Sequence, residues 1–288
     1  MSGPRSSPPV VPIEDPGDQR VAPYLAIRER DLVGRRGEFI AEGEVVLRVL
    51  LRAGVRCRPS SLLIAENRLG SLADLTEHVP PDVPIYVARP AVMDAIAGFH
   101  IHRGVLAHGA RPPDLGAVAL IARLRRQAIV MALFGVSNHD NVGGLFRNAA
   151  AFGVDAVLLD PHCCDPLYRK AIRVSVGATL TAPFARLADD EDALALLASQ
   201  GFVPLALAPR GATRLSALEP APRTAILLGS EGLGLPLNIL ERAHTVSIPM
   251  AAGWDSLNVA AASAIALHHL TEARLAASGS VTPRPRNP

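Results

Sequence analysis

Cysteine, lysine, tryptophan and long apolar runs are all scarce in this sequence of 288 residues. Its three cysteines, Cys57, Cys163 and Cys164, contain no Cys-x-x-Cys pair, which argues against a disulfide framework and against a zinc site. No apolar run approaches the roughly 18 residues that a membrane span requires, and the first residues contain no apolar signal-peptide core. We therefore expect a soluble cytoplasmic protein with reduced thiols that have no functional role.

Lysine occurs only once, at Lys170, so the cationic surface consists almost entirely of guanidinium groups. These groups bind phosphate through several planar donors. The formal net charge is only +2, but residues 20–58 hold nine Arg against five acids, and residues 103–126 hold five Arg against one acid. Such clusters fit either a solvated surface or a nucleic-acid contact, and composition alone does not decide between them.

The first half of the sequence predicts a compact α/β unit over residues 20–113. Residues 37–55 have the pattern of a short strand followed by a helix, and residues 61–67 and 84–88 have that of buried strands. Residues 91–99 predict a further helix.

Segments rich in proline, glycine or charge set the domain boundaries. Residues 1–19 are rich in Pro, Ser and charge and predict a disordered lead-in. A break at ARPPDLGA, around Pro112, precedes a basic linker over residues 114–126. The second domain is expected over residues 127–276, followed by a disordered tail over residues 277–288.

The second half alternates strands with helical stretches, which predicts a mostly parallel sheet covered on both faces. Its apolar strands are expected at residues 128–134, 155–160, 202–208, 224–229 and 244–250. In such a sheet the ligand lies in the loops that follow the carboxyl ends of the strands. Those loops are therefore the candidates for chemistry.

Three of these loops carry unusual residue patterns. FGVSNHDNVGGLFRNAAAFG predicts a helix capped by Asp140 or Asn141, and by itself it fits an ordinary helix with a surface Arg. LLGSEGLGLP has glycines in the order G-x-x-G-x-G, which disfavours both a dinucleotide-binding turn and a P-loop. GWDSLNVAAASA predicts a core helix that begins near Leu257, with Asp255 or Ser256 as its cap.

Together these loops resemble a known family. NVGGLFRNAAAFG, LLGSEGLGLP and IPMAAGWDSLNVAAASAIAL are similar, in order, to the three signature motifs of the SpoU family, RNA ribose 2′-O-methyltransferases of the SPOUT class. The resemblance covers about residues 127–275. The earlier stretch GRRGEFIAEGEVVLRVLL resembles the small ribosomal-protein-like RNA-binding domain that many members carry in front.

The resemblance implies a fold that periodicity alone would not suggest, because chains generally avoid knots. It implies an α/β protein whose C-terminal domain is a trefoil-knotted, mostly parallel sheet, preceded by a small α/β RNA-binding domain. It also implies S-adenosyl-L-methionine as cofactor and a homodimer with active sites near the subunit interface. The expected substrate is a structured RNA, ribosomal rather than transfer RNA.

The resemblance also assigns residues. The cofactor contacts it implies are Gly229, Ile248, Met250 and Leu257, and the residues it implies at the reacting end are Asn141, Arg147, Glu231, Ser256 and Asn258. Arg147 is either the base that the family pattern suggests or a clamp on the adjacent phosphate, because a guanidinium does not readily accept a proton. Ser256 and Asn258 would orient the ribose or Arg147, and Glu231 would position loop backbone or a partner Arg. The alternative for Ser256 is that it only caps the following helix and has no role in the reaction.

The sequence departs from the family pattern at Trp254 and at His139-Asp140, which precede Asn141, and neither departure removes a motif position. Trp254 stands where a smaller residue is usual; we expect it to be buried against the knot, and stacking on an unpaired base is the alternative. The closely spaced His100 and His102 resemble a pair of metal ligands. No further ligand cluster lies near them in the sequence, so we expect no metal.

Two functions of different classes remain. The first is an RNA 2′-O-methyltransferase, favoured by the full set of five polar motif residues. The second is a non-catalytic RNA-binding or ribosome-associated protein that retains the knotted fold. A nicotinamide-dependent oxidoreductase is excluded by the glycine order.

Overall fold

The computed structural model describes residues 7–25, 37–52 and 54–278. The chain forms two compact units: unit 1 consists of residues 1–113 and 165–181, and unit 2 of residues 114–164 and 182–288. Parts of the predicted lead-in, of the basic stretch 20–58 and of the predicted tail lie outside the described residues. Among the residues that the structure describes, no helix combines the length and apolarity needed to cross a membrane.

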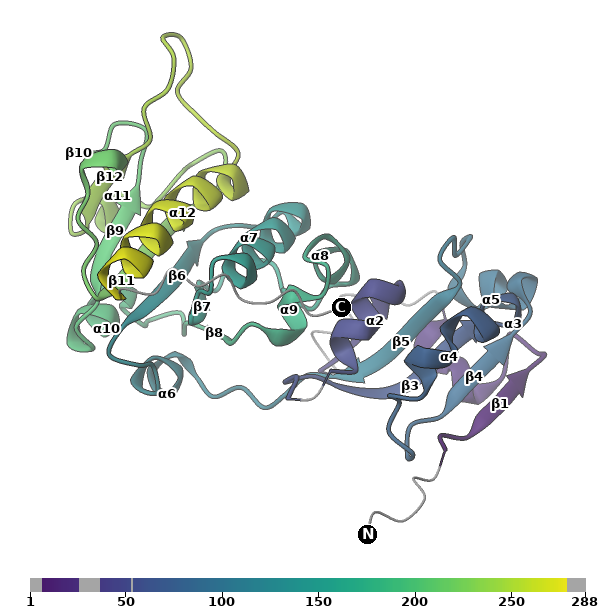
Figure 1. The fold of residues 1–288 in the computed structure, drawn as a ribbon. Coiled ribbons are helices and arrows are strands. Elements are labelled where there is room, and N and C mark those ends of the chain that lie inside the picture. Colours follow the sequence, from purple (N-terminus) through teal and green to yellow (C-terminus); the bar gives the residue numbers. More distant parts are fainter. Residues whose placement is uncertain (1–6, 26–36, 53, 279–288) are drawn as a thin grey trace. The chain divides into compact units, whose positions relative to one another are not determined.

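Unit 1 is built on a five-stranded mixed sheet with the order β1-β4-β3-β5-β2 (Figure 1). Its strands are β1 (Val10–Ile13), β2 (Glu38–Glu42), β3 (Arg58–Ala65), β4 (Ile85–Ala88) and β5 (Val105–Ala110). Its helices are η1 (Gln19–Tyr24), α2 (Glu44–Leu50), α3 (Glu66–Leu69), η3 (Gly70–Leu72), α4 (Ala73–Thr76), α5 (Pro90–Ala97), α8 (Arg169–Val174) and α9 (Ala178–Thr181). Met93 and Ile96 of α5 pack into a core with Val21 and Leu63.

The prediction of a disordered lead-in over residues 1–19 is wrong for residues 10–13. These form β1, which pairs in parallel with β4, Val10 lying opposite Ile85. Pro12 is tolerated because β1 is an edge strand, where a missing N–H need not cost a ladder bond. Ile13 is fully buried and anchors the strand in the core of unit 1.

Unit 2 is built on a seven-stranded sheet with the order β10-β12-β9-β11-β6-β7-β8, in which every described pairing is parallel. Its strands are β6 (Ala128–Phe134), β7 (Ala156–Leu159), β8 (Phe184–Arg186), β9 (Val203–Leu207), β10 (Thr213–Arg214), β11 (Arg223–Gly229) and β12 (His244–Ser247). Its helices are α6 (Ala117–Ala122), α7 (His139–Ala151), α10 (Ala193–Ser199), η4 (Leu215–Ala217), α11 (Leu237–Leu240) and α12 (Val259–Ser278). The predicted α/β class with a mostly parallel sheet is confirmed.

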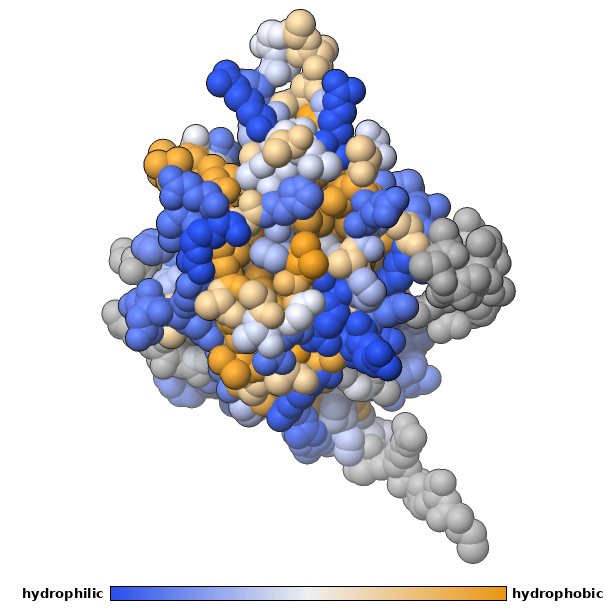
Figure 2. All heavy atoms as spheres, turned by 90° about the vertical axis from the view of Figure 1, so that its left-hand side faces the viewer, coloured by the Kyte–Doolittle hydropathy of each residue, from blue (hydrophilic) through white to orange (hydrophobic). Residues whose placement is uncertain are grey.

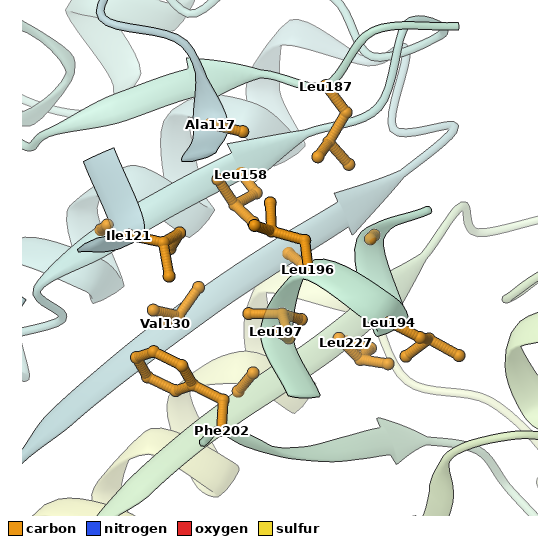
Figure 3. Close-up of a cluster of buried hydrophobic side chains, with 14 of the residues drawn as sticks. Ala117, Ile121, Val130, Leu158, Leu187, Leu194, Leu196, Leu197, Phe202 and Leu227 are labelled. Carbon is orange, nitrogen blue, oxygen red and sulfur yellow. The ribbon is translucent and has the colours of Figure 1, made fainter. Parts of the chain in front are cut away.

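Helices cover both faces of this sheet. On one face α6, α10 and α11 contribute to the core that Figure 3 shows, where Ile121 and Leu197 lie over Val130 and Leu227 of the central strands. On the other face α7 and α12 lie side by side (Figure 1). A sheet buried on both faces explains the nearly continuous apolar runs of β6 and β11.

The predicted basic linker over residues 114–126 is wrong, because it contains α6. Ala117, Leu120 and Ile121 recur at helical spacing and are buried in the core of unit 2. The prediction of a disordered tail over residues 277–288 is wrong for its first two residues, 277–278, which continue α12.

The strand register brings the motif loops to one edge of the sheet. Phe134 at the end of β6 lies opposite Gly229 at the end of β11. Because parallel strands share a carboxyl edge, the loops after β6, β11 and β12 all emerge there. The loop between β12 and α12 projects from the rest of unit 2 (Figure 1).

Candidate functional site

Helix α7 is capped by Asn138, and not by Asp140 or Asn141 as expected. The Asn138 Oδ1 atom accepts a hydrogen bond from the backbone N–H of Asp140 at 2.8 Å. Asn141 therefore lies in the first turn of the helix, where its side chain is buried and free to contact other elements.

Helix α12 is capped by Asn258, three and two residues after the expected caps Asp255 and Ser256. Its Oδ1 atom accepts hydrogen bonds from the backbone N–H groups of Ala260 at 2.9 Å and Ala261 at 3.2 Å. The helix begins at Val259 and not near Leu257. These bonds fix the orientation of the Asn258 amide, because the oxygen must face the helix and the nitrogen must face away.

The Asn258 amide nitrogen joins the three motif loops. It donates to Asn141 Oδ1 at 2.9 Å and to Glu231 Oε1 at 2.7 Å. Asn141 follows β6, Glu231 follows β11 and Asn258 follows β12. Three polar residues that are far apart in the sequence thus form one hydrogen-bonded cluster, which we call the amide cluster.

A second set of contacts fixes α12 against α7. Asn148 Nδ2 donates to the Ala260 carbonyl at 2.7 Å and to the Ser263 hydroxyl at 2.8 Å. Sequence reasoning missed this role, although Asn148 lies seven residues after Asn141 and so on the same face of the helix. Gly144 lies between them in the helix, and a Cβ at this position would lie only 2.9 Å from the Ala260 Cβ. The two helices therefore pack as closely as their backbones allow.

A cavity of about 450 Å³ lies beside the amide cluster at the carboxyl edge of the sheet. It is lined by Leu207, Ala208, Pro209, Leu228, Gly229, Ser230, Glu231, Gly232, Leu233, Gly234, Leu235, Leu240, Val246, Ile248, Met250, Asp255, Ser256, Leu257, Val259 and Ala262. All four residues expected to contact the cofactor are among them. The cavity combines an apolar wall with much exposed loop backbone, which suits a ligand that is apolar in part and hydrogen-bonded in part.

Glycine is required at position 229, which lines the cavity. A Cβ on Gly229 would lie 2.1 Å from the carbonyl carbon of Gly234, so the loop after β11 passes directly over the end of the strand. The loop is closed by a hydrogen bond from the Gly234 N–H to the Ser230 carbonyl at 2.9 Å. Gly234 itself has a φ of +70°, which favours glycine.

The structure does not bring all five expected reacting-end residues together. Ser256 lines the cavity but does not cap the helix. Arg147 lies on the exposed side of α7, about 120° around the helix from Asn141. It forms no hydrogen bond or ion pair with any residue in the described ranges, and it does not line the cavity.

The prediction that Trp254 is buried is wrong, since its side chain is 76% exposed. The backbone N–H of Trp254 donates to the Ala251 carbonyl at 3.2 Å in a turn that contains Gly253 with a φ of +89°. This turn points the chain away from the body of unit 2, and residues 251–258 are all exposed.

The remaining chemically reactive side chains lie elsewhere. His100 and His102 form an edge-to-face pair in unit 1, and His100 bonds to Asp94 at 2.7 Å. Nowhere in the described part of the chain do three His, Cys, Asp or Glu side chains gather closely enough to hold a metal ion. Burial raises the pKa of the Cys57 thiol to about 11, and burial together with the nearby Asp160 raises that of Cys163.

Comparison with known proteins identifies the family to which this site belongs. The sequence profile described as the SpoU rRNA methylase family matches residues 128–268, the part of the chain that contains the cavity and the amide cluster. An uncharacterized tRNA/rRNA methyltransferase of Mycobacterium tuberculosis is 40% identical over 266 residues, which cover 89% of this chain and 90% of that protein. The chain belongs to the SpoU rRNA methylase family.

Solved structures of similar fold agree with SpoU membership. The SpoU methyltransferase AviRb of Streptomyces viridochromogenes, in complex with AdoMet, matches with a TM-score of 0.76 at 22% identity, covering 90% of this chain and 98% of that one. An AdoMet-bound rRNA methyltransferase of Sinorhizobium meliloti matches with a TM-score of 0.76 at 21% identity, covering 91% and 98%. At these identities the likeness concerns the fold.

Proposed function

We propose that this SpoU-family protein transfers a methyl group from S-adenosyl-L-methionine to a ribose 2′-hydroxyl of a structured RNA, ribosomal rather than transfer RNA. The observation that carries the proposal is the bond from Asn258 to both Asn141 and Glu231, because it joins the three motif loops beside a single cavity. Related structures are described as AdoMet complexes and as an RNA 2′-O ribose methyltransferase, which supports the reaction class.

The cavity supports binding of S-adenosyl-L-methionine. Its volume of about 450 Å³ lies within the usual range for small-molecule sites. Ile248, Met250 and Leu257 provide an apolar wall suited to an adenine ring, and the loop that follows Gly229 provides backbone donors and acceptors. When bound, the cofactor would supply a methyl group on a sulfonium centre for transfer to the ribose oxygen, leaving S-adenosylhomocysteine.

The polar residues beside the cavity contribute mainly by alignment. Methyl transfer is accelerated most by holding the two reacting atoms in line at near-contact distance. Glu231 and Asn141 hold Asn258, and through it the start of α12, at a fixed position beside the cavity. The Ser256 hydroxyl lines the cavity and can donate a hydrogen bond to the ribose.

Arg147 requires a different explanation, because it does not reach the cavity of its own chain. We infer that the protein is a homodimer in which Arg147 of one subunit serves the cavity of the other. There its guanidinium would hold the phosphate next to the target ribose and polarise the hydroxyl, whose proton would pass to water late in the transfer. Exposed apolar side chains on unit 2, among them Ile265 of α12, support a subunit contact there.

We also propose that the C-terminal domain is a trefoil knot. Two close approaches of backbone to backbone support it. A Cβ on Gly229 would meet the backbone of Gly234, and a Cβ on Gly211 would lie 2.4 Å from the carbonyl carbon of Val246. Chain segments that pass so close leave no room for side chains, as threading one loop through another requires.

The central test is cofactor binding followed by mapping of the product. Calorimetry should detect binding of S-adenosylmethionine and S-adenosylhomocysteine, and mass spectrometry should find a ribose methylation that disappears in cells lacking the protein. A protein that binds RNA but neither cofactor form would be the non-catalytic alternative.

Arg147→Ala should abolish methylation while leaving cofactor affinity within a few-fold, since Arg147 does not line the cavity. The homodimer adds a sharper test. Mixing inactive Arg147→Ala with an inactive Gly229→Val variant should restore activity, because the heterodimer contains one intact composite site. A substantially active Arg147→Ala protein would remove this residue from the mechanism, and a mixture without activity would contradict sharing between subunits.

A further inference from the structure

Trp254 is an exposed aromatic residue in a chain that has few aromatics. It is the single tryptophan, and Phe, Trp and Tyr together make up only 4% of the sequence. Its indole is 76% exposed on the loop that joins β12 to α12. Figure 2 shows this loop standing above the rest of unit 2, with hydrophilic side chains on either side of its base.

The position of Trp254 relates it to the cavity. The next three residues, Asp255, Ser256 and Leu257, all line the cavity. We call the residues that directly adjoin this lining along the chain the rim of the cavity, and Trp254 is one of them. The exposed Arg210 is another, because it directly follows the cavity-lining residue Pro209. Arg210 makes no hydrogen bond or ion pair within the described ranges. An exposed aromatic ring together with an Arg whose guanidinium is available to a phosphate is typical of surfaces that bind single-stranded nucleic acid.

We infer that Trp254 stacks on an unpaired base at the methylation site and thereby positions the target ribose over the cavity. This inference rests on the proposed function, since it assumes that RNA enters at this rim. Stacking on aromatic rings is the usual means by which proteins hold splayed-out bases of RNA. The turn from Ala251 to Trp254 is closed by a backbone hydrogen bond, and the 76% exposure of Trp254 leaves its ring accessible to a base.

The single tryptophan makes the first experiment specific, because all indole fluorescence comes from Trp254. The full-length protein, saturated with S-adenosylhomocysteine, is titrated with a short single-stranded RNA and separately with the same sequence as a duplex. The single strand should quench the emission, and the duplex should quench it much less because its bases are already stacked. If RNA leaves the emission unchanged, the inference is wrong. If the emission instead changes when the protein is diluted, Trp254 belongs to a subunit interface, which also overturns the inference.

The second experiment separates stacking from simple apolar contact. Trp254→Leu keeps apolar bulk but removes the aromatic face, whereas Trp254→Phe keeps a stacking ring. Trp254→Leu and Trp254→Ala should raise the KM for RNA about 5- to 150-fold, the range expected for one lost stacking contact. The kcat and the cofactor affinity should change little, and Trp254→Phe should remain close to the original protein.

A matched control is Leu237→Ala, because Leu237 is 75% exposed on unit 2, close to the value for Trp254, but neither of its chain neighbours lines the cavity. It should leave the KM for RNA unchanged. Equal KM values for Trp254→Leu and the original protein would overturn the stacking role. Failure of the original protein to bind cofactor would instead contradict the proposed function, so the two failures are distinguishable.

Discussion

Asn258 combines two tasks that would normally need two residues. Its oxygen caps α12, and its nitrogen bonds to Asn141 and Glu231. The start of the helix and the shape of the cavity rim therefore depend on a single amide. Substitutions that remove one task and keep the other can separate them.

Asn258→Asp keeps a capping oxygen but places a carboxylate where the donor was, facing Glu231. We expect a lower melting temperature and loss of methylation. The double variant Asn258→Asp with Glu231→Gln restores an amide donor opposite the new carboxylate, and we expect it to recover much of the melting temperature. Asn258→Ala removes the cap as well, at a cost of about 1 kcal/mol. No recovery in the double variant would contradict the Asn258–Glu231 bond.

Thiol reactivity provides a second prediction for individual side chains. Burial holds the pKa of Cys57 near 11 and raises that of Cys163, so both thiols are protonated at neutral pH. Alkylation with iodoacetamide, followed by peptide mass spectrometry, should modify the half-buried Cys164 first and the other two only on unfolding. Rapid labelling of Cys57 in the folded protein would contradict this.

The sequence singled out Asn141, Glu231 and Asn258, and the structure joins them by hydrogen bonds. Their catalytic roles stay a prediction. The bonds themselves could not be foreseen, because they depend on strand register. The cap of α12 was misplaced because Asp255, Ser256 and Asn258 are all good capping residues, and local preference does not choose among them. The exposure of Trp254 was missed because an aromatic residue beside a core helix is usually buried.

The contact between α7 and α12 is the main packing constraint on the helices around the site. Gly144 contacts Ala260 there, and Asn148 bonds to the same turn of α12. Since α7 carries Asn141 and α12 carries Asn258, any separation of the helices also stretches the amide cluster.

Gly144→Ala adds a Cβ only 2.9 Å from the Ala260 Cβ and should force the helices apart. We expect the free energy of unfolding to fall by about 1–3 kcal/mol, as for other overpacked contacts, and methylation to weaken. Urea denaturation measures the first effect. Gly70→Ala is the matched control, because its added Cβ meets nothing within 4 Å, and it should be neutral or slightly stabilising.

Strands were predicted well where they are long and apolar, and poorly where they are short or interrupted. β6 and β11 are central, buried on both faces and easily recognised. β8 and β10 have only three and two residues, too few for a periodic pattern. β5 contains Gly109, which weakens the strand pattern but is required because a Cβ there would lie 2.4 Å from the Phe39 ring.

Ion pairs distributed over both units link the stability of the chain to pH. Hydrogen bonds from Arg20 lower the pKa of Asp18 to about 2. Bonds from Arg48, His100 and Arg242 lower the pKa values of Asp74, Asp94 and Asp192 respectively. The ordinary Asp value in an unfolded chain is about 3.9.

A carboxyl whose pKa is lower in the folded state stabilises the fold above its unfolded pKa and loses that effect as the pH falls through its folded pKa. Urea midpoints should therefore be steady near neutral pH and decrease below about pH 4. Asp192→Asn keeps the cap of α10 but loses the charge pair with Arg242, so its midpoint should depend less steeply on pH in this range. An unchanged slope would contradict the ion pair.

The whole fold was predictable as a class but not as a topology. The alternation of strands and helices in the second half predicts a parallel sheet, yet many strand orders are compatible with it. The division of the chain was also missed in part, because residues 165–181 belong to unit 1 although their neighbours in sequence belong to unit 2. A helix as short as α8, with only six residues of which three are Arg or Lys, does not indicate which core it joins.

The pairing of β6 with β11 has a consequence for biosynthesis. β6 is the first strand of its sheet to be made, but β11, its central neighbour, follows only after β7, β8, β9 and β10. On the ribosome, β6 can pair early only with β7. The backbone groups on its other edge stay unpaired until β11 has been made. Sheets that depend on such remote partners form slowly and expose unpaired edges meanwhile. The emerging chain should therefore benefit from a chaperone until β11 is translated.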